Sequence, residues 1–214
     1  MLSDIKGVIF DLDGTIADSM WVWSQIDIDY LRNKGCCMPK NLRNEIEHLS
    51  FNQTALYFKE KFNLEDSIEN ILNDWHSMAL NSYSNDVKLK PGVKEFFDYL
   101  KSYNIKISLA TSNSIPLLEA CLKNNDVYDY FDSITTTDEV CTGKNSPDVY
   151  LLAAKKLGID PENCLVFEDI LPAVQSAKSA HMKVIAVKDD TCLYSEEDFL
   201  KYADKYIYSF LELL

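Results

Sequence analysis

Two aspartates, Asp11 and Asp13, stand two residues apart directly after a short apolar run at residues 8–10. Side chains at positions i and i+2 of an extended segment point the same way, so both carboxylates face one crevice. Carboxylates this close repel each other unless one is protonated or a cation lies between them, and a site with oxygen ligands alone favours Mg²⁺. An Asx-turn that ends a strand uses the same Asp-x-Asp-Gly pattern, and these residues alone leave both interpretations open.

A second acidic pair, Glu168 and Asp169, follows the apolar run at residues 164–167. If both runs are strands of one parallel sheet, all these carboxylates meet at its carboxyl edge, where open α/β folds bind ligands. The four groups would hold a formal charge of about −4, which requires bound cations, basic neighbours or shifted pKa values. Capping of a helix that begins near Leu171 is the competing interpretation for Asp169.

A third loop, at residues 111–114, has the sequence Thr-Ser-Asn-Ser and follows an apolar run at residues 107–110. Hydroxyl groups and free backbone N–H groups at the start of a helix suit phosphate oxygens. We therefore expect Ser112 and Asn113 to contact an anionic substrate, while a plain helix cap is the competing interpretation for Ser114.

Strand and helix patterns alternate along most of the chain and predict the sheet that would position these loops. The β-prone runs are continuous rather than alternating in polarity, as buried parallel strands should be, and helix-period patterns lie between them. We therefore predict an α/β fold with a doubly wound, Rossmann-like parallel sheet. The predicted strands are residues 5–10, 105–110, 133–137, 164–168, 183–187 and, more weakly, 205–208, and the last helical pattern runs to residue 181.

The alternation stops between residues 16 and 85, where helix-period patterns occur and no convincing strand is found. An apolar stripe in this segment includes Trp23, which we therefore expect to be buried in the core of a helical insert. Pro91 and Gly92 then mark the start of a helix in the following segment. We predict two domains, an α/β core domain of residues 1–15 and 86–214 and a helical cap domain of residues 16–85.

The composition excludes several classes of protein. The chain has 214 residues with 21 Lys and Arg against 34 Asp and Glu, a formal net charge of −13. This acidic balance removes the electrostatic basis for binding nucleic acid. With 47% hydrophobic residues the chain has too much apolar surface for a disordered protein, so we expect a packed core.

The six cysteines form no CxxC motif and no Cys/His cluster, so neither a structural zinc site nor a disulfide scaffold is indicated. The N-terminal segment is unlike a signal peptide, and no apolar run approaches the roughly 20 residues needed to span a bilayer. We expect a cytoplasmic protein with reduced thiols and no membrane partner. The pattern leaves the oligomeric state open, with a monomer favoured.

Lys144 lies in a loop before another predicted helix and completes the set of chemical groups. The predicted edge of the sheet thus holds, in chain order, an acid pair, a hydroxyl group, a lysine and a second acid pair. In this arrangement the sequence resembles the haloacid dehalogenase superfamily, in particular its phosphatases with a helical cap inserted after the first strand. The resemblance covers nearly the whole chain and is carried by DLDGT at residues 11–15, Thr111, Lys144 with Pro147 and Asp148, and Phe167-Glu168-Asp169.

The resemblance implies roles for four residues in catalysis. Asp11 matches the family's nucleophile, which attacks phosphorus and becomes an aspartyl phosphate. Asp13 matches the acid/base that protonates the leaving oxygen and then activates water. Thr111 would hold phosphoryl oxygens, and Lys144 would bridge Asp11 and the phosphate. Dehalogenases of the superfamily lack an acid two residues after the nucleophile, so Asp13 sets dehalogenation aside.

The resemblance also implies a Mg²⁺ cofactor. Asp11, the backbone carbonyl of Asp13 and Asp169 would bind it, with Glu168 helping directly or through water. An anion that attacks an anionic phosphate needs a metal and a lysine before it can approach, which agrees with this set of residues.

The chain departs from the family pattern at several positions. Ile170 and Ala173 stand where a serine and a glycine are common, which predicts a different arrangement around the metal. In the β-phosphoglucomutase branch a cap histidine and a cap arginine would grip a second phosphate, whereas Trp23 and Phe51 stand at those positions here. This difference favours a phosphatase, and with Trp21 these two residues are candidates for an apolar or sugar-stacking wall.

The sequence thus predicts a Mg²⁺-dependent phosphomonoester hydrolase that acts on a small phosphorylated metabolite. A β-phosphoglucomutase-like sugar phosphomutase is the alternative enzyme. A receiver-like regulatory module also uses acids, a threonine and a lysine, but the chain length and the helical insert oppose it. A catalytically silent scaffold is opposed as well, because a set of charged groups at a sheet edge has no evident benefit for stability.

Overall fold

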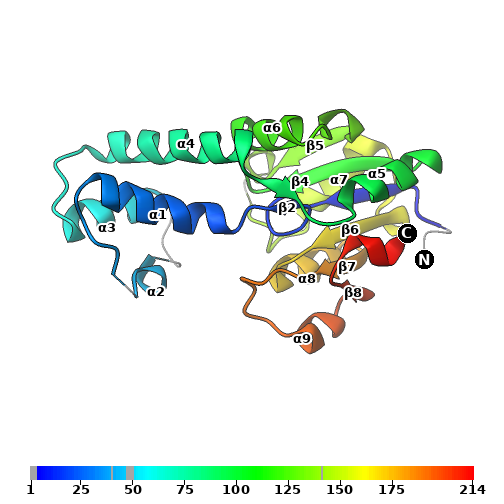
Figure 1. The fold of residues 1–214 in the computed structure, drawn as a ribbon. Coiled ribbons are helices and arrows are strands. Elements are labelled where there is room, and N and C mark those ends of the chain that lie inside the picture. The colour runs from blue at the N-terminus through cyan, green and yellow to red at the C-terminus, as the bar shows by residue number, and fades with distance from the viewer. Residues whose placement is uncertain (1–3, 40, 47–50, 141) are drawn as a thin grey trace. The chain divides into compact units, whose positions relative to one another are not determined.

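Six parallel strands form one sheet among the residues that the computed structural model describes, 4–39, 41–46, 51–140 and 142–214 (Figure 1). The strand order β5-β4-β1-β6-β7-β8 places the first strand in the interior, with later strands added on both sides. This topology confirms the predicted doubly wound α/β fold. The strands are β1 Gly7–Phe10, β4 Lys106–Thr111, β5 Ser133–Thr136, β6 Cys164–Glu168, β7 Lys183–Val187 and β8 Lys205–Ile207.

The register of the central strands aligns their carboxyl ends. Phe10 of β1 pairs with Leu109 of β4 on one side and with Phe167 of β6 on the other. The next residues along β1 and β6, Asp11 and Glu168, therefore emerge side by side at the same edge of the sheet. This alignment brings together groups that are more than a hundred positions apart in the sequence.

Helices cover both faces of the sheet because alternate strand residues point to opposite sides. On one face, Ile9 packs in a cluster with Val149 of α7 and Val174 of α8. On the other face, Phe10 packs against Phe96 of α5. The helices of this part of the chain are α5 Val93–Ser102, α6 Ile115–Asn124, α7 Asp148–Leu157, α8 Leu171–Ser179 and α9 Glu196–Leu200, with short 3-10 turns η1 Tyr128–Tyr130, η2 Thr137–Glu139, η3 Pro161–Asn163 and η4 Phe210–Leu213.

A cluster of phenylalanine rings fills the second face. The ring of Phe10 lies 4.9 Å from that of Phe167, 5.0 Å from Phe97 and 6.1 Å from Phe210, measured between centroids. All four side chains are fully buried. Since Phe210 belongs to η4, the C-terminal turn is anchored directly beneath the strands that end in the acidic residues.

The chain divides into two compact units, Met1–Ser19 with Val87–Leu214 and Met20–Asp86. The second unit is helical, and Trp75 of α4 forms the centre of its core, with ring centroids 5.7 Å from Tyr30 and 4.9 Å from Phe58. Its helices are α1 Trp21–Asn33, α2 Leu42–Ile46, α3 Phe51–Lys61 and α4 Ile68–Asn85.

The prediction that Trp23 is buried is wrong, because its side chain is 39% exposed. The buried face of α1 contains Val22, Ile26 and Tyr30, so Val22 and not Trp23 lies on the buried side of the first turn. Trp23 instead lies at the margin of this face, with its ring 5.4 Å from that of Phe51, which is also exposed.

Two local predictions of secondary structure are also wrong. A two-residue strand, β2 Ala17–Asp18, pairs antiparallel with β3 Lys88–Leu89, although no strand was expected between residues 16 and 85. Strands this short show no periodic pattern in a sequence. The helix predicted to run through residue 181 ends at Ser179, because His181 adopts a left-handed conformation with φ of 61°.

Five cysteines are free thiols in the described part of the chain, and Cys141 lies outside it. Burial raises the pKa of the Cys121 thiol to about 12 and that of Cys164 to about 11, so these two thiols are poor nucleophiles. Among the helices described here, none combines the length and the apolarity that crossing a membrane requires.

Replacement of Phe210 by alanine tests the importance of the phenylalanine cluster. We expect Phe210→Ala to lower the free energy of unfolding by about 3–5 kcal/mol, since it leaves a cavity among fully buried rings. The matched control is Leu193→Ala, because the Leu193 side chain is 92% exposed. Urea denaturation followed by circular dichroism measures both, and equal stability of the two variants would contradict a structural role for the cluster.

Candidate active site

The loop after β1 is held in a tight turn that presents Asp11 and Asp13. The backbone N–H of Asp11 donates to the carbonyl of Phe167 at 3.1 Å, which keeps this residue in line with β6. Gly14 follows with φ of 81°, a left-handed conformation that favours glycine, and its N–H donates to the carbonyl of Ala17 at 3.0 Å. The glycine of the Asp-x-Asp-Gly pattern thus allows the chain to reverse immediately after the second acid.

Lys144 lies between two carboxylates of different strands. Its ammonium forms ion pairs with Asp11 and with Glu168, the latter at 2.6 Å, and its side chain is only 7% exposed. Glu168 is fully buried, and the same oxygen that contacts the lysine accepts a hydrogen bond of 2.7 Å from the Tyr150 hydroxyl. The ammonium therefore joins the ends of β1 and β6 and has little freedom to move.

Burial and mutual repulsion disfavour the charged forms of Asp11 and Asp169. Burial raises the pKa of Asp11 to about 6, against the lowering effect of Lys144 and with a further rise from the Glu168 carboxylate. Burial and the carboxylates of Asp11 and Glu168 likewise hold the pKa of Asp169 well above its usual range. Burial tends to lower the pKa of Lys144, but the two carboxylates outweigh it and keep the lysine protonated.

Asp11, Glu168 and Asp169 form a group that suits a divalent cation. One carboxylate oxygen from each lies within 4.8 Å of the others, and all three residues are buried. The hydroxyl of Thr15 lies 2.8 Å from Oδ1 of Asp169 and 3.3 Å from Oδ2 of Asp11, so it fixes the orientation of two members. Oxygen ligands with unbalanced negative charge are what a hard divalent cation requires.

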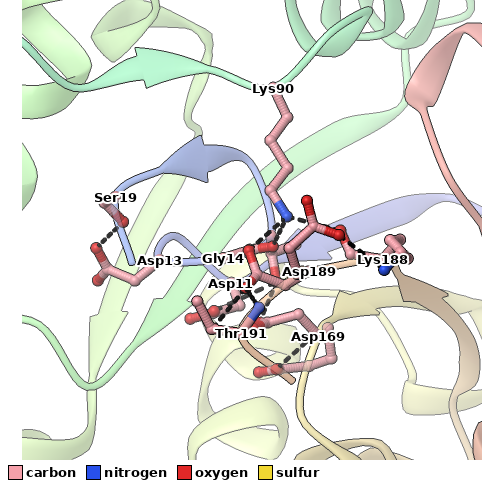
Figure 2. A network of polar contacts seen from close by, with 12 residues as sticks. Asp11, Asp13, Gly14, Ser19, Lys90, Asp169, Lys188, Asp189 and Thr191 are labelled. Carbon is pink, nitrogen blue, oxygen red and sulfur yellow. Dashed lines mark hydrogen bonds and ion pairs between the residues drawn. The ribbon is translucent and has the colours of Figure 1, made fainter. Parts of the chain in front are cut away.

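Asp13 stands apart from that group and has its own donors. The Ser19 hydroxyl donates to Oδ1 of Asp13 at 2.6 Å, and the Asn113 amide donates to Oδ2 at 2.8 Å (Figure 2 shows the Ser19 contact). The backbone N–H of Asn113 in turn donates to Oγ1 of Thr111 at 3.0 Å. These contacts join the loop after β4 to the loop after β1, while Ser112 of the same loop is exposed.

The structure therefore places most of the predicted site residues near one another. Asp11, Lys144, Glu168 and Asp169 form a single polar group, and Asp13, Asn113 and Thr111 form a chain of hydrogen bonds beside it. The competing interpretations as helix caps gain no support, because the helices after Ser114 and Ile170 have no capping bond from a side chain.

Three residues of the site were not assigned from the sequence. Thr15 was part of a quoted motif, and its position four residues after Asp11 in a turn could have indicated a contact. Ser19 carried no signal beyond its polarity. Tyr150 lies on the buried face of α7, where an aromatic residue resembles ordinary core, so nothing in the pattern predicted a hydroxyl bonded to Glu168.

Comparison with known proteins gives a consistent family. Residues 8–187 match the model of the family described as "Haloacid dehalogenase-like hydrolase". The chain is 32% identical to the phosphorylated carbohydrates phosphatase of Thermotoga maritima, covering 85% of this chain and 84% of that protein. It is 27% identical to hexitol phosphatase B of Escherichia coli K12, covering 86% and 83%.

A solved structure shares the fold over almost the whole length. It is described as a "putative beta-phosphoglucomutase from Thermotoga maritima", and it superposes with a TM-score of 0.85 at 29% identity, covering 95% of this chain and 94% of the other. The match includes both the α/β part and the helical segment.

The pKa of Asp11 leads to a pH-dependent stability in metal-free buffer. The folded-state pKa of Asp11, about 6, exceeds the ordinary 3.8. Protonation of Asp11 therefore adds to the free energy of unfolding below about pH 4, and this added stability is lost as the pH rises through 6. We expect Asp11→Asn, which stays neutral, to be more stable than the wild type at pH 8 by an amount on the order of 1–3 kcal/mol.

The difference should shrink steadily as the pH falls from 8 towards 4, because Asp11 then becomes protonated in the folded state. Urea denaturation across this pH range measures it. A variant less stable than the wild type at pH 8 would show that Lys144 stabilises the ionised aspartate more than burial opposes it.

Proposed function

Since this chain belongs to the haloacid dehalogenase-like hydrolase family, we propose that it hydrolyses a small phosphorylated metabolite through a covalent phosphate on Asp11. The chain is a phosphatase, as its curated relatives are. The observation that carries the proposed chemistry is the contact of the Lys144 ammonium with both Asp11 and Glu168, beside Asp169, at the carboxyl edge of the sheet.

In the proposed first step, an oxygen of Asp11 attacks phosphorus and the bond from phosphorus to the ester oxygen breaks. Both partners are anionic, so their approach requires that negative charge be offset. Lys144 supplies a fixed positive charge at Asp11 and stabilises the charge that develops on the phosphoryl group. Because Lys144 also contacts Glu168, it cannot turn away as the reaction proceeds.

Asp13 is the proposed acid/base. Its proton passes to the leaving oxygen as the first ester bond breaks, and its carboxylate then takes a proton from the water that attacks the aspartyl phosphate. Ser19 and Asn113 donate to its two oxygens, which fixes the direction of the carboxyl group. Since the Asp13 carboxylate lies outside the group formed by Asp11, Glu168 and Asp169, the side chain that transfers the proton is not one of the carboxylates assigned to a cation.

Thr111, Ser112 and Asn113 are the proposed contacts of the phosphoryl oxygens. Their loop follows β4, the neighbour of β1, and leads into α6, where free backbone N–H groups favour anions. The Thr111 side chain is buried and oriented by the Asn113 N–H, so its position is fixed before the substrate binds.

We assign Mg²⁺ to the group of three carboxylates, with Asp11 and Asp169 as ligands, Glu168 as a direct or water-mediated partner and the backbone carbonyl of Asp13 as a further ligand. When bound, the cation offsets negative charge and holds the phosphoryl group in place. The raised pKa values of Asp11 and Asp169 agree with this assignment, because burial and the neighbouring carboxylates disfavour their charged forms, and a bound cation would favour them.

The smaller unit, Met20–Asp86, is the proposed cap domain, and its exposed aromatic rings are the proposed determinants of substrate choice. Trp21, Trp23 and Phe51 present ring surface to solvent, and a flat apolar ring suits the non-polar face of a sugar. A phosphorylated sugar or sugar alcohol is therefore the proposed substrate class, in agreement with the names of the two curated relatives. The acidic chain is proposed to act in the cytoplasm, without nucleic acid or membrane as a partner.

Replacement of the nucleophile is the direct test. We expect Asp11→Asn to reduce phosphate release from an aryl phosphate by at least about 10⁴-fold, because an amide cannot form the covalent intermediate. The matched control is Asp129→Asn, which changes an exposed aspartate in η1. A phosphatase assay with circular dichroism as a folding check decides the matter, and retained turnover in a folded Asp11→Asn protein would remove Asp11 from the mechanism.

Removal of metal tests the cation. We expect EDTA to abolish activity, added Mg²⁺ to restore it, and Asp169→Asn to raise the Mg²⁺ concentration for half-maximal activity by at least about tenfold. Thermal unfolding of the wild type with and without Mg²⁺ gives a readout independent of turnover, and we expect a higher melting temperature with the metal. Full activity in the chelator would contradict the assignment. An assay that follows phosphate release together with sugar-phosphate isomers separates the phosphatase from the phosphomutase alternative.

A further inference from the structure

Lys90 forms a buried polar contact with the loop that carries Asp11 and Asp13. It follows β3, and its ammonium donates to the backbone carbonyl of Gly14, to the carbonyl of Lys188 at 2.8 Å and to Oδ2 of Asp189 at 2.9 Å (Figure 2). The side chains of Lys90 and Asp189 are 13% and 6% exposed. Three loops of the larger unit therefore meet at one ammonium group.

The lysine holds this loop at two points. Besides the side-chain bond to Gly14, the backbone N–H of Lys90 donates to the carbonyl of Ile16 at 2.8 Å. The carbonyl of Gly14 belongs to the same peptide group as the N–H of Thr15. Because the Thr15 hydroxyl lies 2.8 Å from Asp169 and 3.3 Å from Asp11, the orientation of this peptide sets the position of a side chain inside the acidic group.

Asp189 in turn keeps Lys90 in place. Its second oxygen, Oδ1, accepts bonds from the backbone N–H of Thr191 at 2.9 Å and from the Thr191 hydroxyl at 2.6 Å. The carboxylate is thus satisfied on both sides and cannot rotate without losing buried hydrogen bonds. A buried ammonium without such a partner would carry a large desolvation penalty, so the ion pair is needed for the lysine to point inward.

We infer that Lys90, held by Asp189, is a positioning residue for the phosphatase reaction, which fixes the Gly14–Thr15 peptide and thereby the geometry of Asp11 and Asp169. The inference rests on the proposed function of Asp11 as nucleophile. Lys90 does not touch the carboxylates of the acidic group in the described contacts; it acts through a backbone carbonyl and through Thr15. Its effect should therefore fall on the rate of the chemical step and not on substrate affinity.

The experiment compares Lys90→Met, Asp189→Asn and Lys106→Met. Lys106→Met is the matched control, because the ammonium of Lys106 also donates to a backbone carbonyl, that of Leu157 at 2.7 Å, but at the amino end of β4, opposite the acidic edge. The kcat and KM of each variant are measured with an aryl phosphate at saturating Mg²⁺. The amide ¹⁵N shift of Thr15 is measured by NMR, since that nitrogen is bonded to the Gly14 carbonyl carbon.

We expect Lys90→Met to lower kcat by about 10- to 100-fold with KM changed less than about twofold, because a small misplacement of reacting groups costs rate while substrate contacts remain. The Thr15 amide shift should move in this variant and stay at the wild-type value in Lys106→Met. Asp189→Asn should lower kcat by a smaller factor. A protein with both Lys90→Met and Asp189→Asn, made as a fourth variant, should be no slower than Lys90→Met alone, because both substitutions act through one contact.

A folded Lys90→Met protein with wild-type kcat would overturn the inference, even if its melting temperature fell, since the lysine would then be a structural contact alone. If Lys90→Met does not fold, Asp189→Asn decides in its place, and wild-type kcat in that variant would have the same meaning. If the wild type releases no phosphate, the proposed function fails, and an unmoved Thr15 shift in Lys90→Met would separately disprove the positioning contact.

Discussion

The ion pairs of Lys144 with Asp11 and Glu168 offset part of the repulsion between the buried carboxylates at the edge of the sheet. Three buried carboxylates lie near a single ammonium, so these carboxylates are not fully neutralised by the protein's own cations. The arrangement persists because β1 and β6 are hydrogen-bonded neighbours whose ends cannot move apart. The packing of the sheet and its core therefore keeps these carboxylates closer together than their mutual repulsion favours. A bound cation, as proposed above, would offset this negative charge, and that offset is what a reaction between a carboxylate and an anionic phosphate requires.

Neutral donors give the site its geometry. Thr15, Ser19, Asn113 and Tyr150 each donate a hydrogen bond to a carboxylate or lie within reach of one, and each comes from a different turn or helix. A donor that bonds to an oxygen of a carboxylate restricts the rotation of that carboxylate. The acids thus point in set directions before any ligand is bound, which is the condition for a low cost of reorganisation during the reaction.

The sequence predicts the parts of this protein that depend on long apolar runs. The bounds of β6 and β7 match the prediction residue for residue, because strands buried on both faces leave an uninterrupted hydrophobic signal. The two acid pairs were predicted to lie close together because strand ends in a parallel sheet share one edge, whereas Thr111 and Lys144 were assigned through the resemblance to the family. The exposure of Trp23, the pairing of β2 and the hydrogen bond of Tyr150 were missed. Each depends on tertiary contacts: the rotation of a helix against its neighbours, the pairing of a two-residue strand, and the partner of a buried hydroxyl. The contact of Lys90 with Gly14 belongs to the same class, since no periodicity connects residues so far apart.

The antiparallel pairing of Asp18 with Lys88 affects how the segment between them can change during evolution. The two strands that leave and re-enter the larger unit are hydrogen-bonded to each other, so the intervening helices form an insertion whose ends already meet. An insertion of this kind can be shortened, lengthened or exchanged for another without changing the register of the parent sheet. If the inserted helices choose the substrate, as proposed above, the accepted compound can change during evolution while the residues at the edge of the parent sheet stay in place.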